Sequence, residues 1–277
     1  MKIYLGPAGI PTVCKGGSTI EGIKTVSELG LNALEVEFVR GVHMSNQTAK
    51  ETGKVAKDLG ILLSIHAPYY INLISPEIDK VDASKKRILD SFEKAHLMGA
   101  NVVVVHAGYY GKRDKEYCFE EMKKEIKDLM KMVESRGFGD VLLGLETTGK
   151  MSQWGTLDEI VRMGKEIKKC VPVLDSAHIF ARQAGKIDYD KLFDKIEELR
   201  LKHLNCHFSG IKWSPAGQGG GNERYHVEIS SNQPPFEPLA KEILKRKIDT
   251  TIISESPILE QDSLRMKKVF EKLGYRD

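Results

Sequence analysis

Eight short apolar runs alternate with eight amphipathic stretches along this chain of 277 residues. The apolar runs are rich in Val, Ile and Leu and lie at about 2–6, 33–38, 61–66, 101–106, 141–146, 171–175, 203–208 and 250–255. The amphipathic stretches follow them at about 18–29, 45–59, 83–99, 115–136, 156–169, 188–199, 236–247 and 259–273. Such continuous apolar runs are typical of strands buried on both faces of a parallel sheet. The strict alternation therefore predicts an α/β fold, a single-domain TIM (β/α)8 barrel over residues 1–277.

A doubly wound open sheet is the alternative arrangement for alternating strands and helices. That fold usually carries a phosphate-binding loop directly after its first strand. Here the loop reads Gly6-Pro7-Ala8-Gly9-Ile10-Pro11, without GxGxxG spacing and without a Walker lysine. Its two prolines also remove backbone N–H donors that a phosphate would need. The loop sequence therefore favours the barrel.

Composition and cysteine spacing limit the class of protein. Hydrophobic residues make up 41% and charged residues 29%, as is usual for a globular domain with a full core. The net charge of +3 permits an anionic partner without requiring one. No apolar run approaches the roughly 20 residues of a membrane span, and no signal peptide precedes the first strand. The four cysteines lack CxxC spacing, so we expect a reduced, cytoplasmic protein that does not bind membranes.

Six of the predicted strands end on a side chain that can bind metal. These residues are His66, His106, Glu146, Asp175, His207 and Glu255. A single such ending is usually a cap or a satisfied polar group, but in a parallel barrel the carboxyl ends of all strands meet at one mouth. Imidazoles and carboxylates that meet there predict a site for divalent metal, zinc above all, with more than one ion.

Two further histidines could join this site. His178 lies three residues after Asp175, where a turn would lead into the next helix. His226 lies in the long glycine-rich segment 209–235, which we expect to be a loop over the mouth of the barrel. A histidine in a loop is more often solvated than ligating, so position alone makes His226 a weaker candidate than His178.

The strand ends and the residues after them resemble the endonuclease IV family of apurinic/apyrimidinic endonucleases, within the wider group of xylose-isomerase-like TIM barrels. Each matching motif is short, but their order and their strand positions agree over essentially the whole chain. The motifs are His66-Ala67-Pro68-Tyr69-Tyr70-Ile71-Asn72-Leu73, His106-Ala107-Gly108, Leu145-Glu146-Thr147-Thr148-Gly149, Leu174-Asp175-Ser176-Ala177-His178-Ile179-Phe180-Ala181, His207-Phe208-Ser209 and Ser254-Glu255-Ser256-Pro257.

The resemblance implies three zinc ions. One ion would take His66, His106 and Glu146. A second would share Glu146 as a bridge and add Asp175, His207 and Glu255. The third would take His178 and His226 and, in the family, an aspartate two residues before the second histidine.

This chain departs from the family pattern at the third zinc site. Arg224 occupies the position of the aspartate and cannot bind a cation. Glu223 lies one residue further away and is a possible substitute. The departure leaves open whether two or three ions bind, and with it full nuclease competence.

The resemblance also implies the reaction and the partner. Family members cut damaged double-stranded DNA on the 5′ side of abasic sites during base excision repair, usually as monomers and without a protein partner. Clustered zinc can activate a water molecule and neutralise charge on a phosphodiester, and Glu146 and Glu255 are the candidate catalytic residues. Candidate DNA-binding residues are Tyr69 and Tyr70, whose rings could stack on bases, with Lys212 and Arg224 in the long segment.

Two other functions compete with the nuclease. A sugar isomerase or epimerase of the same superfamily needs one divalent ion, such as Mn²⁺, and Glu146, Asp175, His207 and Glu255 would suit it equally well. The four remaining histidines favour the nuclease, because a one-metal isomerase does not need them as ligands. A non-catalytic nucleic-acid-binding module is disfavoured, because buried clustered carboxylates are costly without a cation.

Overall fold

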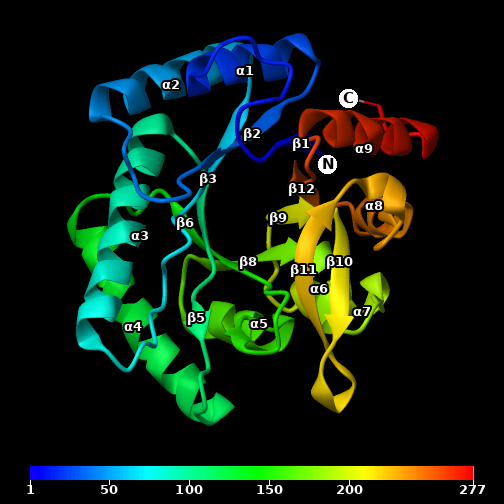
Figure 1. Cartoon of the computed structure of the whole chain (residues 1–277). Coiled ribbons are helices and arrows are strands. Elements are labelled where there is room, and N and C mark those ends of the chain that lie inside the picture. The colour runs from blue at the N-terminus through cyan, green and yellow to red at the C-terminus, as the bar shows by residue number, and fades with distance from the viewer. Residues whose placement is uncertain (277) are drawn as a thin grey trace.

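The computed structural model describes residues 1–276. Eight parallel strands form one sheet in the order β1-β12-β9-β8-β6-β4-β3-β2, and the sheet curls into a barrel surrounded by helices (Figure 1). The strands are β1 (Ile3–Pro7), β2 (Ala33–Glu37), β3 (Leu62–His66), β4 (Val102–Val105), β6 (Leu142–Glu146), β8 (Cys170–Asp175), β9 (His203–Phe208) and β12 (Asp249–Ser254). The predicted TIM barrel is confirmed, and each predicted strand lies within one residue of the observed bounds.

The barrel is nearly closed, because β1 and β2, at the two ends of the strand order, are joined just after β1. A single parallel bridge joins Ala8 to Glu35, and the Gly9 amide donates to the Glu35 carbonyl oxygen at 2.8 Å. Gly6 makes this approach possible, since a Cβ there would lie 1.7 Å from the carbonyl oxygen of Ala33. The first and last strands of the sheet are thus brought together where a side chain is absent.

The helices cover the outside of the barrel. In chain order they are α1 (Thr19–Glu28), α2 (Asn46–Leu59), α3 (Ile78–Met98), α4 (Lys115–Ser135), α5 (Leu157–Glu166), α6 (Ser176–Arg182), α7 (Tyr189–Glu197), α8 (Phe236–Arg246) and α9 (Glu260–Lys272). Capping boxes fix the starts of α1 and α5, where Ser18 and Thr156 each accept from a backbone amide three residues on. Left-handed glycines end α2 and α3.

Two helix predictions were wrong at one end, and one helix was missed. Helix α3 begins at Ile78, five residues before the predicted start at 83, although Ile78 itself is exposed. Helix α5 ends at Glu166 rather than 169, because Ile167 adopts an extended backbone with φ of −125° and ψ of 113°. Helix α6 follows β8 directly and is only seven residues long, which is too short for a periodic pattern to reveal.

Alternation along the strands decides which side chains face the inside of the barrel. Val102 and Val104 of β4 pack against Val171 and Val173 of β8 in a cluster of their own, separate from the larger core. Gly144 of β6 lies between β4 and β8, and a Cβ at this position would clash with Val102 and Val173. Residues two further along each of these strands continue on the same inward face. The inward face therefore leads to the predicted metal ligands at the strand ends.

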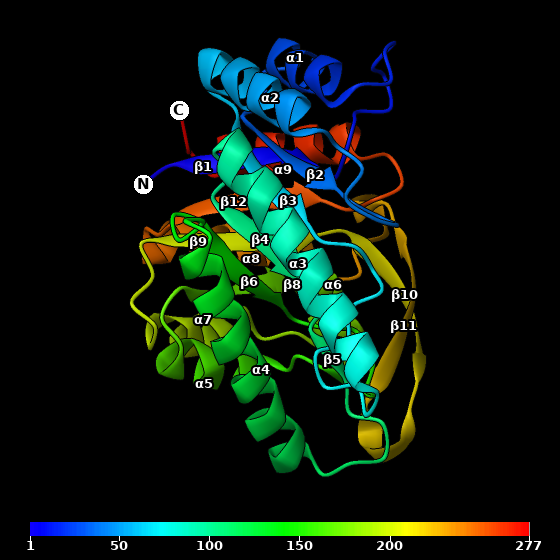
Figure 2. The same cartoon turned by 90° about the vertical axis from the view of Figure 1, so that its left-hand side faces the viewer.

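The segment 209–235 is not the irregular loop that the sequence predicted. It contains an antiparallel hairpin of β10 (Gly210–Pro215) and β11 (Gly221–Val227), with 3-10 turns η1 (Gly217–Gly219) and η2 (Ile229–Ser231). A second, smaller antiparallel pair joins β5 (Gly108–Tyr109) to β7 (Gln153–Trp154). Figure 2 shows the long hairpin at the carboxyl ends of the barrel strands, on the side opposite both chain termini. The segment does lie over the mouth, as expected.

Among the helices of residues 1–276, none combines the length and the apolar character needed to cross a membrane.

Candidate metal centre

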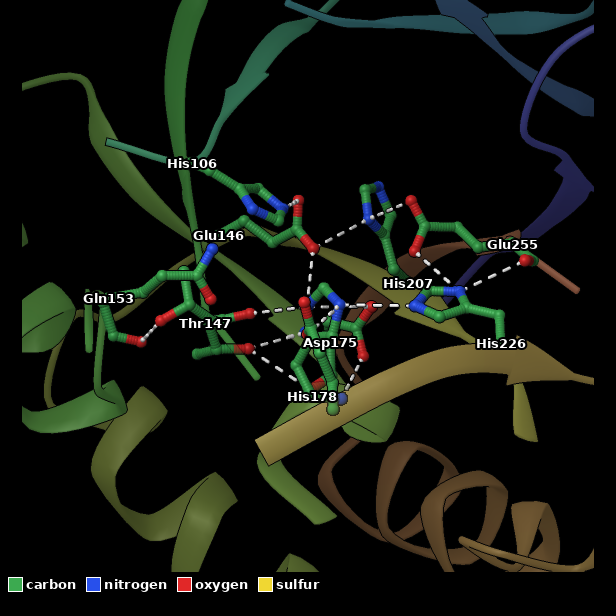
Figure 3. A network of polar contacts seen from close by, with 12 residues as sticks. His106, Glu146, Thr147, Gln153, Asp175, His178, His207, His226 and Glu255 are labelled. Carbon is green, nitrogen blue, oxygen red and sulfur yellow. Dashed lines mark hydrogen bonds and ion pairs between the residues drawn. The ribbon is translucent and has the colours of Figure 1, made fainter. Parts of the chain in front are cut away.

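The six predicted strand-end residues converge at the mouth of the barrel. Glu146 lies at the centre, and histidines surround it on both sides (Figure 3). Its Oε2 is 2.9 Å from Nε2 of His106 and 3.2 Å from Nε2 of His66. Its Oε1 is 3.1 Å from Nδ1 of His178 and 3.5 Å from Nδ1 of His207. The two carboxylate oxygens therefore face two different sets of imidazoles.

The first set is His66, His106 and Glu146, whose ligand atoms lie within 4.8 Å of one another. His66 Nδ1 donates to the carbonyl oxygen of Ala67 at 2.8 Å. A carbonyl oxygen can only accept, so this contact places a ring proton on Nδ1. Nε2, which faces Glu146, is then the nitrogen that can bind a cation once it loses its own proton. The set matches the first predicted ion site.

The second set is Glu146, Asp175, His207 and Glu255, again within 4.8 Å. Nδ1 of His207 lies 3.2 Å from Oε1 of Glu255. Asp175 holds its position by capping α6, since its Oδ1 accepts from the His178 amide at 2.7 Å. Its other oxygen, Oδ2, is left for a ligand. This set matches the second predicted ion site.

The third set brings His178 and His226 together with Asp175 and Glu255. His178 Nδ1 donates to the carbonyl oxygen of Thr147 at 3.0 Å, and His226 Nδ1 donates to that of Glu255 at 3.2 Å. The two Nε2 atoms then face each other at 3.3 Å, each with a lone pair. Two acceptors at that distance need a proton or a cation between them. The hairpin β10–β11 thus places His226 at the site, although the expected position of His226 in a loop had made this residue the weakest candidate.

Glu223 reaches the third set because of a β-bulge. Lys212 pairs with Tyr225, but Trp213 pairs with Glu223, so Arg224 is an extra residue in β11. A bulge shifts the alternation of side chains by one position. As a result Glu223, rather than Arg224, points toward His178, with 3.0 Å between Oε2 and Nε2.

The carboxylate of Glu223 occupies a space that only glycine leaves open. A Cβ on Gly149 would lie 1.9 Å from Oε2 of Glu223. The Glu223 amide also donates to the Gly149 carbonyl oxygen at 3.0 Å, and Lys150 lies 3.5 Å from the other carboxylate oxygen. The glycine that follows β6 and the bulge in β11 together fix this carboxylate beside the histidines.

Several buried ligand atoms at the mouth have no hydrogen-bond partner within residues 1–276. They include Glu146 Oε1, Asp175 Oδ2, His207 Nδ1 and Glu223 Oε2. Buried polar atoms are normally paired. Here carboxylate oxygens and imidazole nitrogens lie together, and too few of them carry a proton to form hydrogen bonds with the others. Such a donor set of imidazoles and carboxylates fits divalent metal and zinc in particular.

Burial and charge act against each other on these groups. Burial alone would raise the pKa of Glu146, but the charges of His106 and His207 outweigh it and hold that pKa well below the usual range. Burial raises the pKa of Asp175 to about 7. Burial would lower the pKa of His66, but the hydrogen bond to Glu146 and nearby carboxylates raise it to about 10. The protein without metal must therefore retain protons that cations would displace.

Two acidic residues of the mouth were missed by the sequence analysis. Glu35 and Glu37 lie on the inward face of β2, in the run Ala33-Leu34-Glu35-Val36-Glu37. Glu35 Oε1 is 2.9 Å from Nε2 of His207, and its Oε2 accepts from the Ser64 hydroxyl at 2.7 Å. Burial raises the pKa of Glu37 to about 8. The available signal was a pair of carboxylates two residues apart within a run that otherwise predicts a buried strand.

The candidate DNA-binding residues surround the mouth but differ in what they can reach. Tyr69 and Tyr70 are 57% and 66% exposed, and the Tyr69 ring lies 5.9 Å from the His66 ring. Lys212 is exposed on β10. Arg224 is exposed as well, but its Nε donates to the Ser214 hydroxyl at 2.9 Å, which turns it along the hairpin and away from the histidines.

Two known proteins are similar in sequence to most of this chain. A protein of Methanocaldococcus jannaschii described as uncharacterized is 33% identical over 281 residues, covering 99% of this chain and 98% of its own. The probable endonuclease 4 of Mycoplasma mobile is 25% identical over 223 residues, covering 76% of this chain and 74% of its own.

Two solved structures with different names share this fold. Endonuclease IV from Thermus thermophilus superposes with a TM-score of 0.72 at 19% identity, covering 98% of each chain. A D-tagatose 3-epimerase-like protein also has a TM-score of 0.72, at 18% identity, covering 98% of this chain and 96% of its own. A family model described as xylose isomerase-like TIM barrel matches residues 23–273. The chain therefore belongs to the xylose isomerase-like TIM barrel family.

Proposed function

We propose that this protein is a zinc-dependent phosphodiesterase that cuts double-stranded DNA on the 5′ side of abasic sites. One observation carries the proposal: His178 and His226 face each other at 3.3 Å, with Glu223 3.0 Å from His178, beside the two sets that Glu146 joins. A one-metal isomerase has no use for this set, whereas hydrolysis of a phosphodiester gains from several cations around the phosphate. The likeness to proteins named endonuclease 4 supports the same conclusion.

The ligands divide among three sites around the central carboxylate. His66 and His106 would share the first ion with Glu146, and Asp175, His207 and Glu255 would complete the second. His178, His226 and Glu223 would hold the third, with Glu223 in the role that Arg224 cannot fill. When bound, clustered divalent cations neutralise charge on the phosphate and acidify a water molecule. Six carboxyl groups lie at the mouth, and if all were ionised their charge would match that of three divalent ions. They are Glu35, Glu37, Glu146, Asp175, Glu223 and Glu255.

The protein groups near the reacting atoms have separate tasks. Glu255 contacts both His207 and His226, at 3.2 and 3.6 Å, so it lies between the second and third sets, where it can accept a proton from water. Tyr69 and Tyr70 present exposed rings beside the cavity and would fill the gap in the duplex left by a missing base. Lys212 and Arg224 would contact phosphates outside the cavity. We expect a monomer that needs no protein partner.

A sugar isomerase or epimerase is the second candidate, because the four ligands Glu146, Asp175, His207 and Glu255 are also sufficient for one Mn²⁺ or another divalent ion. The equal superposition on an epimerase-like structure favours neither function, because at this identity it shows only the fold. The third ligand set distinguishes them.

The test is incision of a labelled duplex that carries one abasic site. Purified protein loaded with zinc should cut that duplex on the 5′ side of the lesion and leave an intact duplex uncut, and a chelator should abolish cutting. The parallel assay follows epimerisation of free ketoses with Mn²⁺ or Co²⁺. Turnover of a ketose without any incision would reject the nuclease and support the isomerase.

A further inference from the structure

Glu37 is a carboxyl group of the mouth that belongs to none of the three ligand sets. It ends β2, in register with His66 on β3. It lines the same cavity as His66 and Glu255, a space of about 400 Å³. The Oε1 atom of Glu37 is buried, and no group in the described part of the chain forms a hydrogen bond with it. A buried acceptor without a donor is unfavourable, so this oxygen indicates that a ligand supplies the donor.

The unpaired acceptor oxygen of Glu37 limits what that ligand can place beside it. A phosphodiester has only acceptor oxygens at neutral pH, so it cannot donate to this atom, and it is repelled whenever Glu37 is ionised. The phosphate of a substrate therefore belongs where His106, His178 and Glu146 would hold the cations. The part of the cavity at Glu37 is left for an uncharged part of the substrate that donates a proton.

A hydroxyl group meets this requirement. A carboxyl group has an oxygen able to accept a hydrogen bond in either protonation state, so the contact does not depend on the charge of Glu37. An abasic deoxyribose carries a hydroxyl at C1′, where an intact nucleotide carries its base. The cavity volume lies at the lower end of the range for small-ligand sites, which suits one sugar with its phosphate.

We propose that Glu37 accepts a hydrogen bond from the C1′ hydroxyl of the abasic sugar and so determines which lesions are cut. This inference rests on the proposed nuclease function. Its consequence is discrimination against a tetrahydrofuran lesion, which has the same ring and phosphates but no hydroxyl at C1′. A lost hydrogen bond to a buried carboxyl group corresponds to about 10- to 100-fold in kcat/KM.

The experiment compares two duplexes that differ only in this hydroxyl. One carries an abasic site made by uracil removal, and the other carries tetrahydrofuran at the same position. Wild-type protein with zinc should cut the first with a kcat/KM about 10- to 100-fold higher. Glu37→Gln keeps an acceptor oxygen and should keep most of the preference, whereas Glu37→Leu should cut both duplexes at equal rates. Val39→Ala changes the same cavity without a polar atom and should keep the wild-type ratio.

The ratio separates recognition from a structural role. If Glu37 only stabilised the barrel, Glu37→Leu would lower both rates and leave their ratio unchanged, and the inference would be wrong. Equal cutting of both duplexes by the wild type would also overturn it, while leaving the nuclease function in place. Cutting of neither duplex would reject the nuclease function and the inference with it.

Discussion

Replacement of Glu146 by glutamine should remove two metal ions at once. Its Oε2 faces His66 and His106, and its Oε1 faces His207 across the second set. Glu146 is the only carboxylate of the first set, so the amide would leave that cation with two neutral imidazoles. The second set would retain two of its three carboxylates.

The size of the effect follows from the charge that is lost. Two unit charges about 4 Å apart in a partly polar environment attract by about 4 kcal/mol, and each 1.4 kcal/mol is a factor of ten in affinity. The first site should therefore weaken by about 10³-fold or more, because a zinc ion is divalent and lies closer than 4 Å to its ligands. The second site should weaken less, because two carboxylates remain.

Elemental analysis after dialysis against a weak chelator measures this directly. Wild-type protein should retain about three zinc ions per chain, and Glu146→Gln about one. His106→Ala is the matched control, because His106 belongs to one set only and its loss should remove a single ion. A thermal scan of each variant shows that it is folded. Loss of one ion or none from Glu146→Gln would refute the bridging role.

Three further predictions concern other residues of the mouth. Gly149→Ala should displace Glu223, whose Oε2 would lie 1.9 Å from the new Cβ, and titration with zinc should then show one weak site in place of a tight one. Glu35→Leu should lower the zinc affinity of the His207 site by about 10- to 100-fold, as loss of an outer partner does, with Glu35→Gln closer to wild type in a competition assay; equal affinity of both variants would exclude an orienting role. In metal-free protein, the pKa of Asp175 is raised by burial to about 7, from 3.8. Its contribution to stability is therefore complete below pH 3.8 and is lost as the pH rises through 7, so Asp175→Asn should raise the melting temperature at pH 8 but not at pH 3.5.

The sequence predicted the parts of this protein that repeat. Most barrel strands are rich in apolar residues, so periodicity and the glycines at helix ends were enough to place the strands within a residue. The fold then determined the site, since side chains at the carboxyl ends of parallel strands must meet. His66, His106 and Asp175 needed no further information than that rule.

Residues outside the repeating pattern were harder to predict. The orientation of Glu223 depends on a bulge at Arg224. The bulge arises from the register in which β10 and β11 pair, and composition does not predict that register. Glu35 and Glu37 interrupt the apolar pattern of a buried strand. From the sequence alone, such carboxylates indicate an irregularity in the strand and do not by themselves indicate a site.

The most direct test of three cations at one mouth is anomalous diffraction from crystals grown with zinc. The account predicts three peaks inside the barrel mouth, one beside His66 and His106, one beside His207 and Asp175, and one between His178 and His226. A single peak among Glu146 and the ligands of the second set, with His178 and His226 in direct contact and no metal between them, would contradict it.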